Sequence, residues 1–395
     1  MTAIVTRMRG RAVPALATSA CTSAAGLLVA VAVARSSTVE ETGRFGVAAA
    51  ATLLVAALAR SAVTDPLVVD GQRPDRLRRL GRASLIGLIG ALVIAVAAVA
   101  LRSEFLAVGA LAVHGLTLRE CVRAVHTARG RARSAVLIEA MLVGAGGIAL
   151  TGTLLGLWGG VVAFGIWALA GATLGYVAVV RGGFAMSPKW SSTPVPTELS
   201  LSYAGDTLVG SGVVQLVTWV ATAIGGLSIA AALRGAGTLA GPVTVTLTAA
   251  RSVLIPRAVA HLQTGAGVPR LALDTVFLCA ASLPLLAALA VVPEPIGSAL
   301  LGATWPFVAP VLALTAAELL FQLVAAVPEA AHRALGRGRR VLALRIGGAV
   351  VRVPVVVLAA PHGIVAVVLS AAVITLCNAI AWWASLALLE RRQTR

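Results

Sequence analysis

Residues 83–101 read ASLIGLIGALVIAVAAVAL, a run of 19 residues without a charged side chain. A helix needs about 20 predominantly apolar residues to cross the hydrocarbon core of a bilayer. This stretch therefore predicts a transmembrane helix. Arg82 stands directly before the run and Arg102 directly after it, so the predicted crossing has a charged boundary at each end.

The same pattern recurs along the whole chain of 395 residues, which is 59% hydrophobic and only 12% charged. Soluble domains are about half apolar and about a quarter charged, so this composition suits a chain surrounded by lipid. We predict an all-α membrane protein of about twelve transmembrane helices. The predicted spans are 13–34, 45–69, 83–101, 105–118, 134–155, 159–180, 201–225, 239–258, 271–292, 307–327, 341–360 and 364–389.

The basic residues predict the orientation of these spans. Four arginines fall in one set of connections, namely Arg35, Arg44, Arg102 and Arg234. Arg60 and Arg352 lie well within spans, and all other Lys and Arg residues fall in the alternate connections, at the span ends that adjoin them, or at the two ends of the chain. Basic connections stay on the cytoplasmic side. Both termini are therefore predicted to be cytoplasmic, and the net charge of +17 needs no nucleic-acid partner.

The chain also contains an internal duplication. Arg123 and the triplet RGR at 129–131 leave the fourth span, while Arg333 and RGR at 337–339 leave the tenth. A repeat of six spans preserves orientation, so the two halves form parallel lobes. The predicted lobes are 1–182 and 201–395, joined by a cytoplasmic linker over 183–200.

Motifs of several enzyme classes are absent from the sequence. The one lysine, Lys189, follows Pro188, so the chain has no P-loop. HExxH and GxSxG are also missing, and the four cysteines have no metal-binding spacing. We therefore predict no catalytic residue, no metal site and no cofactor, and a protein that is not an enzyme.

A few ionisable residues are predicted at membrane depth, where charge is costly unless it has a partner or a wet cavity. Glu318 in span ten and Arg352 in span eleven each lie about 16–17 Å from the end at which their span enters. These two side chains are predicted to pair. The pair either fixes the register of two helices or takes part in substrate binding or coupling.

The second span carries another such pair near its cytoplasmic end, Arg60 and Asp65, and Arg251 occupies the duplicated place in span eight. These arginines either extend to the headgroups or line a cavity. Three further carboxylates are assigned to the membrane interface, and two polar residues to contacts between helices. The carboxylates are Glu139, Asp206 and Asp274, and the polar residues are His114 and Gln215.

With its two six-span lobes and basic cytoplasmic hairpins, the sequence resembles the multidrug/oligosaccharidyl-lipid/polysaccharide (MOP) exporter superfamily, which has the MATE-like fold. The stretches AALRGAGTLAGP at 231–242 and RSVLIPR at 251–257, together with the exit of span four, carry the resemblance. Within the superfamily the chain is most similar to polysaccharide-biosynthesis flippases.

The resemblance implies two six-helix lobes around a central cavity that opens alternately to each side of the bacterial cytoplasmic membrane. It implies an undecaprenyl-pyrophosphate-linked oligosaccharide as substrate, with H⁺ or Na⁺ as the coupling ion where transport is coupled. The candidate cavity residues are Arg60, Arg251, Arg352, Glu318 and Asp65. Two alternatives stay open: a small-molecule or drug antiporter of the same fold, and a non-transporting membrane partner in a polysaccharide synthesis complex.

The predicted topology is tested by cysteine labelling at Ser37 and Ser192 in a cysteine-free background. Ser37→Cys should react with an impermeant maleimide in intact cells, because its loop is external. Ser192→Cys should react only after the cells are opened. The reverse pattern would contradict the orientation derived from the basic residues.

Overall fold

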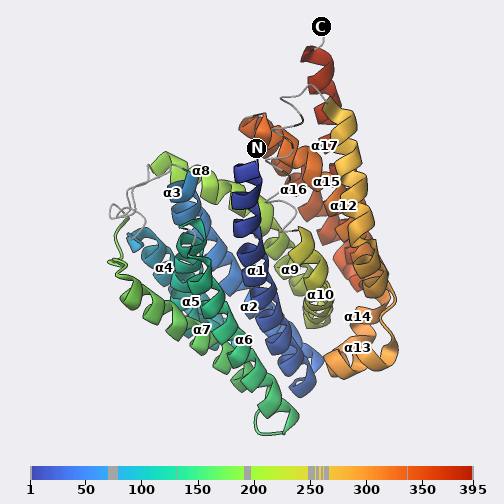
Figure 1. The fold of residues 1–395 in the computed structure, drawn as a ribbon. Helices are drawn as coiled ribbons and strands as arrows, with labels where there is room; N and C mark the ends of the chain where they lie inside the picture. Colours follow the sequence, from blue (N-terminus) through green and yellow to red (C-terminus); the bar gives the residue numbers. More distant parts are fainter. Residues whose placement is uncertain are drawn as a thin grey trace. The chain divides into compact units, whose positions relative to one another are not determined.

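The computed structural model describes residues 2–69, 79–129, 131–190, 197–247, 254, 258, 261, 267–335 and 337–393, nearly all of them helical (Figure 1). In that part of the chain, eleven helices are long and apolar enough to cross a membrane, and Leu227–Leu239 is a shorter apolar helix. These helices confirm the predicted all-α fold with about twelve spans. The chain is a multi-pass membrane protein.

The chain divides into two compact units. Unit 1 comprises Met1–Trp219 with Leu300–Thr304, and unit 2 comprises Val220–Ala299 with Trp305–Arg395. The helices of unit 1 are α1 (Thr2–Ser36), α2 (Val39–Ala59), the π-helix η1 (Arg60–Thr64), α3 (Asp65–Val69), α4 (Gly81–Ala100), α5 (Glu104–Ala128), α6 (Ala132–Leu154), α7 (Gly160–Gly182), α8 (Thr197–Thr207), the π-helix η4 (Leu208–Gly212) and the first half of α9 (Val213–Gly225).

Helix α5 is the centre of unit 1. It packs against α2, α4 and α7, while α1 packs mainly against α6. Phe45 of α2, Phe105 of α5 and Phe164 of α7 are buried together, with ring centroids 5.3–6.1 Å apart. Aromatic side chains contribute large buried areas, so this triad joins the three helices near the predicted external side.

Two glycines allow α5 and α7 to approach closely. A Cβ atom at Gly175 of α7 would lie 2.0 Å from the backbone oxygen of Gly115, and one at Gly115 of α5 would lie 2.6 Å from the backbone of Ala172. Helices in membranes associate through such small residues, because lipid supplies no hydrophobic drive to bring them together.

In unit 2, α15 and α17 form the main pair, α12 packs on α15, and α16 packs on α17. Its helices are the second half of α9, α10 (Leu227–Leu239), α12 (Gly267–Ala290), α13 (Glu294–Leu301), α14 (Trp305–Val308), α15 (Leu312–Ala334), α16 (Gly338–Ala359) and α17 (Ile364–Gln393). Of the long helices in the described part, α16 is the least buried within the protein.

Two predicted spans differ from the structure in extent. The fourth span does not end at residue 118, because α5 continues to Ala128 through the charged segment that holds Arg119, Glu120 and Arg123. The assignment of Arg234 to an external loop is wrong. Arg234 lies inside α10, which begins at Leu227 directly after the positive-φ residue Gly226.

The segment after α7 is fastened to unit 1 by Arg82 at the start of α4. The Arg82 guanidinium donates to the Trp190 carbonyl (3.1 Å) and to the Ser200 hydroxyl, and it stacks on the Trp190 ring at 4.5 Å. Ser200 in turn donates to the carbonyl of Ala62 in η1. Helix α8 therefore packs within unit 1. The predicted lobes, which are defined by the repeat, stay a prediction.

Gly175→Ala should lower the melting temperature of the detergent-purified protein, because the new methyl group collides with the backbone of α5. Overpacking of this kind costs about 1–3 kcal/mol in the free energy of unfolding. The matched control is Gly165→Ala in the same helix, where an added Cβ meets no atom within 4 Å. Equal melting temperatures for the two variants would show that the α5–α7 contact is not needed.

Candidate functional site

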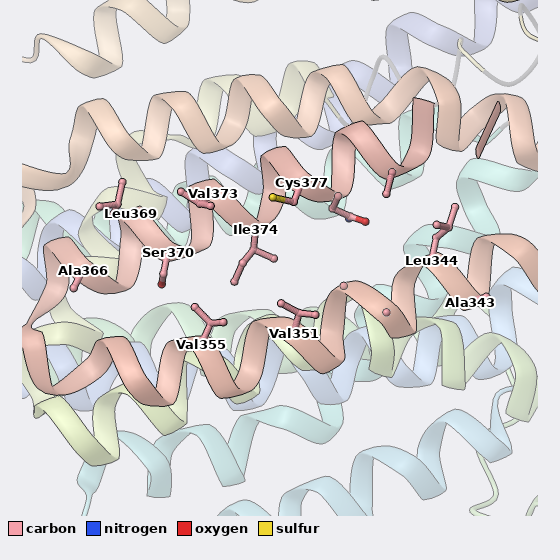
Figure 2. A pocket seen from close by; sticks show the side chains of 14 residues that line it. Ala343, Leu344, Val351, Val355, Ala366, Leu369, Ser370, Val373, Ile374 and Cys377 are labelled. Atoms are coloured by element: carbon pink, nitrogen blue, oxygen red, sulfur yellow. The ribbon is translucent and has the colours of Figure 1, made fainter. Parts of the chain in front are cut away.

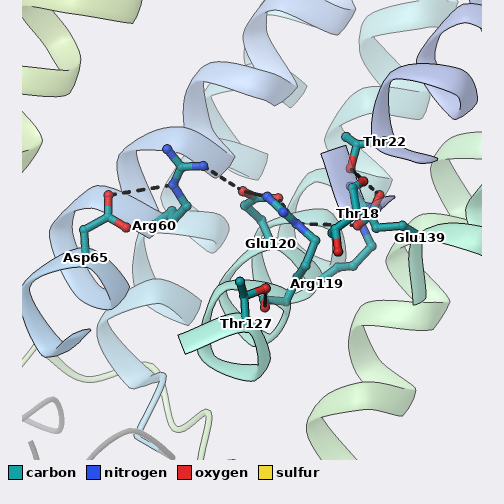
Figure 3. Close-up of polar contacts among 9 residues, drawn as sticks. Thr18, Thr22, Arg60, Asp65, Arg119, Glu120, Thr127 and Glu139 are labelled. Atoms are coloured by element: carbon teal, nitrogen blue, oxygen red, sulfur yellow. Dashed lines mark hydrogen bonds and ion pairs between the residues drawn. The ribbon is translucent and has the colours of Figure 1, made fainter. Parts of the chain in front are cut away.

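Six charged side chains of unit 1 form one chain of ion pairs, here called the unit 1 cluster (Figure 3). Arg60 Nη1 lies 3.1 Å from Glu120 Oε1, and Arg60 Nε lies 3.7 Å from Asp65 Oδ2. Arg123 also binds Glu120, through Nε at 3.1 Å from Oε2. The chain then continues to Glu139, which Arg119 Nη1 contacts at 2.7 Å and Arg123 Nε at 3.6 Å.

Local helix geometry explains how these residues meet. Arg119, Glu120 and Arg123 lie within about one turn of α5, so their side chains reach the neighbouring helices α2 and α6. Arg60 opens the π-helix η1, and Asp65 is the first residue after it. π-Helical turns inside α-helices are frequent at functional sites. The wide turn brings Arg60 towards both Asp65 and Glu120.

Burial changes from one end of the unit 1 cluster to the other. Glu139 is completely buried and also accepts a hydrogen bond from Thr22 Oγ1 of α1 at 2.8 Å. At the other end the side chains of Arg60 and Asp65 are 42% and 39% exposed. Sequence reasoning assigned Glu139 to the membrane interface and did not predict this burial, in which the carboxylate joins α1, α5 and α6 inside the unit.

Unit 2 contains a related but simpler group at the end of α15. Glu329 binds Arg333, four residues further along the same helix, at 3.1 Å, and it also binds Arg345 of α16. Glu120 and Arg123 on α5 are the corresponding residues of the first half. The following helix contributes a carboxylate, Glu139, in unit 1 but an arginine in unit 2. This end of the helix therefore carries an ion pair in both units. The charged residue that the following helix contributes is negative in unit 1 and positive in unit 2.

The predicted pair of Glu318 and Arg352 is present. Arg352 Nη2 of α16 donates to Glu318 Oε1 of α15 at 2.8 Å, and the hydroxyl of Thr375 on α17 donates to the same oxygen at 3.3 Å. The two side chains are 15% and 20% exposed. One carboxylate thus links three helices of unit 2. The role of the pair in substrate binding stays a prediction.

The outcome differs among the other polar residues singled out from the sequence. His114 bridges helices as predicted, with Nε2 at 2.9 Å from Ser84 Oγ of α4 and Nδ1 at 2.8 Å from Tyr176 Oη of α7. Arg251 lies outside the described residues, and its predicted site role is untested. Arg234 is a further candidate site residue that sequence reasoning missed, since it lies about 10 Å along the helix from the start of α10.

In the described part of the chain, no group of three or more His, Cys, Asp or Glu side chains is arranged to hold a metal ion. The candidate sites therefore consist of arginine–carboxylate pairs. Such pairs bind an anion only when the anion replaces, or is added beside, the carboxylate partner. Sequence reasoning found Arg60, Asp65, Glu318 and Arg352. It did not predict that Glu120 and Glu139 would join Arg60 and Asp65 in the unit 1 cluster.

Comparisons with protein-family models and with curated proteins each found no match. Among solved structures, an inward-facing MATE family multidrug resistance transporter of the MOP superfamily is similar with a TM-score of 0.69 at 14% identity, over 95% of this chain and 97% of the other. A MOP superfamily transporter from Pyrococcus furiosus aligns with a TM-score of 0.55 at 15% identity, over 98% and 96%. The chain therefore has the fold of MATE transporters.

The pairing of Glu318 and Arg352 is tested by a double-mutant cycle. Glu318→Gln and Arg352→Gln should each lower the melting temperature, because each leaves one charge unpaired at membrane depth. The double variant should be more stable than the sum of the single losses predicts, by a coupling of about 0.5–3 kcal/mol. Strictly additive losses would argue against an energetic contribution from the pair.

Proposed function

We propose that this protein moves an anionic, undecaprenyl-pyrophosphate-linked oligosaccharide across the bacterial cytoplasmic membrane by alternating access. The fold of the chain is that of transporters, which supports transport of some substrate. The choice of substrate rests on the arginines Arg60 and Arg352, which are predicted at membrane depth and are held by carboxylates in the structure. Pyrophosphate needs fixed cations, and arginine stays charged at any physiological pH and presents planar pairs of donors.

Two of these arginines have a buried N–H group that makes no hydrogen bond within the described residues. Arg352 Nε is buried and has no hydrogen-bond acceptor within the described residues, and Arg60 Nε, also buried, lies 3.7 Å from Asp65 Oδ2, which is beyond hydrogen-bonding distance. Buried donors without acceptors are rare in folded proteins and call for an explanation. A phosphate oxygen is an acceptor that would satisfy them. This supports the proposal that the resting ion pairs are incomplete binding sites for an anion.

In the proposed mechanism the carboxylates hold the arginines until the substrate arrives. Glu318 orients Arg352, and Glu120 orients Arg60, at 2.8 and 3.1 Å. A pyrophosphate carries more than one negative charge, so it competes for the guanidinium groups and releases carboxylates. The conformation that binds the head best is then favoured, since a ligand shifts an equilibrium by its differential affinity. The lipid tail stays in hydrocarbon throughout.

A released carboxylate also provides a way to couple substrate transport to the binding of H⁺ or Na⁺. When Arg352 turns to the substrate, Glu318 loses its cation and becomes the natural place for H⁺ or Na⁺ to bind. Because a charge at membrane depth is costly without a partner, cation entry would follow substrate binding. Asp65 and Arg60 offer the same exchange in unit 1. The proposed event is thus the same in both units: the substrate replaces the carboxylate partner of an arginine.

A drug antiporter is the alternative that the solved neighbours favour, because two of them are multidrug resistance MATE transporters. A site for cationic drugs needs available carboxylates. Here Asp65, Glu120 and Glu318 are each within 4 Å of an arginine. The Pyrococcus furiosus transporter is described as having a binding pocket of reverse polarity that suggests a different function. Pocket polarity can therefore separate functions within this fold.

The function is tested in a strain whose only lipid-linked oligosaccharide flippase is this protein. Arg352→Ala should stop export of surface glycan, and Arg352→Lys should retain part of it, since the charge survives without the bidentate geometry. Arg102→Ala, in the external connection, is the matched control and should export normally. Lipid-linked intermediates should accumulate with their sugars facing the cytoplasm in the Arg352→Ala strain.

Arg352→Ala also leaves Glu318 unpaired, so loss of export could reflect loss of folding. The double variant Glu318→Ala/Arg352→Ala removes both charges and should fold, but it should still fail to export. Normal glycan and no accumulation in the deletion strain would end the flippase proposal. If that strain instead becomes drug-sensitive, the antiporter is the better assignment.

A further inference from the structure

A long apolar groove runs between α16 and α17 in unit 2, with a volume of about 730 Å³ (Figure 2). Both helices contribute side chains that face each other across it. The groove extends from Ala343 to Val355 on α16, about 18 Å along the helix axis. That length is more than half of the hydrocarbon thickness of a bilayer, and the groove runs along two helices that are each long and apolar enough to cross it.

Two glycines on α16 leave open the space that forms the groove. Gly347 and Gly348 stand where a larger side chain would fill the space, and a Cβ atom at Gly347 would meet no other atom within 4 Å. The opposite wall contains Ser370, Ile374 and Asn378 of α17. The Glu318 pair does not line this groove. The groove is thus a separate feature from the candidate transport residues.

A fixed cation stands at one end of the groove. Arg340 lies one helical turn before Leu344, on the same face of α16, and Ser385 lies one turn after Ala381 on α17. Arg340 Nε donates to Ser385 Oγ at 2.7 Å and so bridges the two helices directly beyond the groove lining. Arg340 is also in the first turn of α16, where the helix dipole favours an anion.

The hydroxyl of Ser385 is itself held by a hydrogen bond to His332 of α15. His332 Nδ1 lies 2.8 Å from the carbonyl oxygen of Pro328, which can only accept, so this nitrogen carries the proton. His332 Nε2 therefore accepts from the Ser385 hydroxyl at 2.9 Å. The hydroxyl donates to the histidine and accepts from Arg340. This buried chain fixes the arginine at the end of the groove instead of leaving it to extend freely.

We propose that the α16–α17 groove binds one acyl chain of an anionic phospholipid, whose phosphate is held by Arg340. The predicted orientation puts this end of the groove on the cytoplasmic side, where anionic headgroups attract juxtamembrane basic residues. An apolar chain matches the groove lining, and a phosphate matches the cation at its end. The proposal concerns a bilayer lipid and does not depend on the proposed transport substrate.

A second copy of the protein fits the groove less well. Each copy carries a net charge of +17, and Arg337, Arg339 and Arg340 lie together at this end of α16. Two copies joined here would bring these arginine groups near one another. Like charges disfavour such a contact unless an anion separates them. A single lipid supplies both the apolar chain and the negative charge.

The site is tested by native mass spectrometry of the purified full-length protein with phosphatidylglycerol and with phosphatidylcholine of identical chains. The wild type should bind phosphatidylglycerol about fivefold more tightly, the effect of one arginine near a membrane surface. Arg340→Gln should remove this preference. Arg339→Gln loses the same charge one residue away and should keep it. Gly347→Phe should abolish the bound lipid, whereas Val350→Phe, outside the groove lining, should not.

The groove can also be filled after folding, which removes any doubt about misfolding of Gly347→Phe. Cys377 lines the groove and is exposed. In a variant whose other cysteines are serine, an alkyl methanethiosulfonate attached at Cys377 should displace the bound phosphatidylglycerol. Retention of the lipid after this modification would overturn the proposal. Equal loss of preference in Arg339→Gln and Arg340→Gln would overturn the role of Arg340, and dimers that persist without lipid would favour a second copy.

Discussion

The structure depends on one constraint: a charged side chain at membrane depth must meet an opposite charge. Lipid offers no solvation to an ion, and an isolated charge there costs at least a few kcal/mol. The Glu318–Arg352 contact answers this need at the predicted membrane depth, and arginines answer the same need for carboxylates buried inside a unit. Glu139 is the clearest case, since it is completely buried and bound by Arg119, Arg123 and Thr22. Removing any one partner would expose the others to the same cost.

The constraint also explains how the duplicated halves diverged without losing their common plan. Glu120 on α5 and Glu329 on α15 both bind an arginine of their own helix and one from elsewhere in their unit. What changed is the surrounding charge. Among the described residues, unit 1 links six charged residues into one network, whereas unit 2 has a three-residue group at Glu329, a separate pair at Glu318 and a contact of His261 with Asp274. The duplication preserved the glutamate–arginine pair of this helix but not the charged residues around it.

The two units differ in how tightly their helices pack. In unit 1, backbone meets backbone where Gly115 and Gly175 bring α5 and α7 together. In unit 2, the glycines of α16 do the opposite and leave a groove beside α17, because the facing wall does not close over them. Small residues therefore have two uses in membrane helices. They permit close contact where a partner helix is present, and they admit lipid where it is absent.

The sequence by itself determined the spans and their predicted depth. Apolar length and basic flanks are local properties, so spans such as α4 follow directly from the residues. The pair of Glu318 and Arg352 was also predictable, because each is an isolated charge at similar depth on consecutive helices. Only the tertiary structure decided which way each helix faces. Sequence position gives depth along the membrane normal, but rotation and choice of neighbour arise from packing across the whole unit. For that reason the burial of Glu139 was not predicted, Arg234 was placed in a loop, and the α16–α17 groove had no sequence signal.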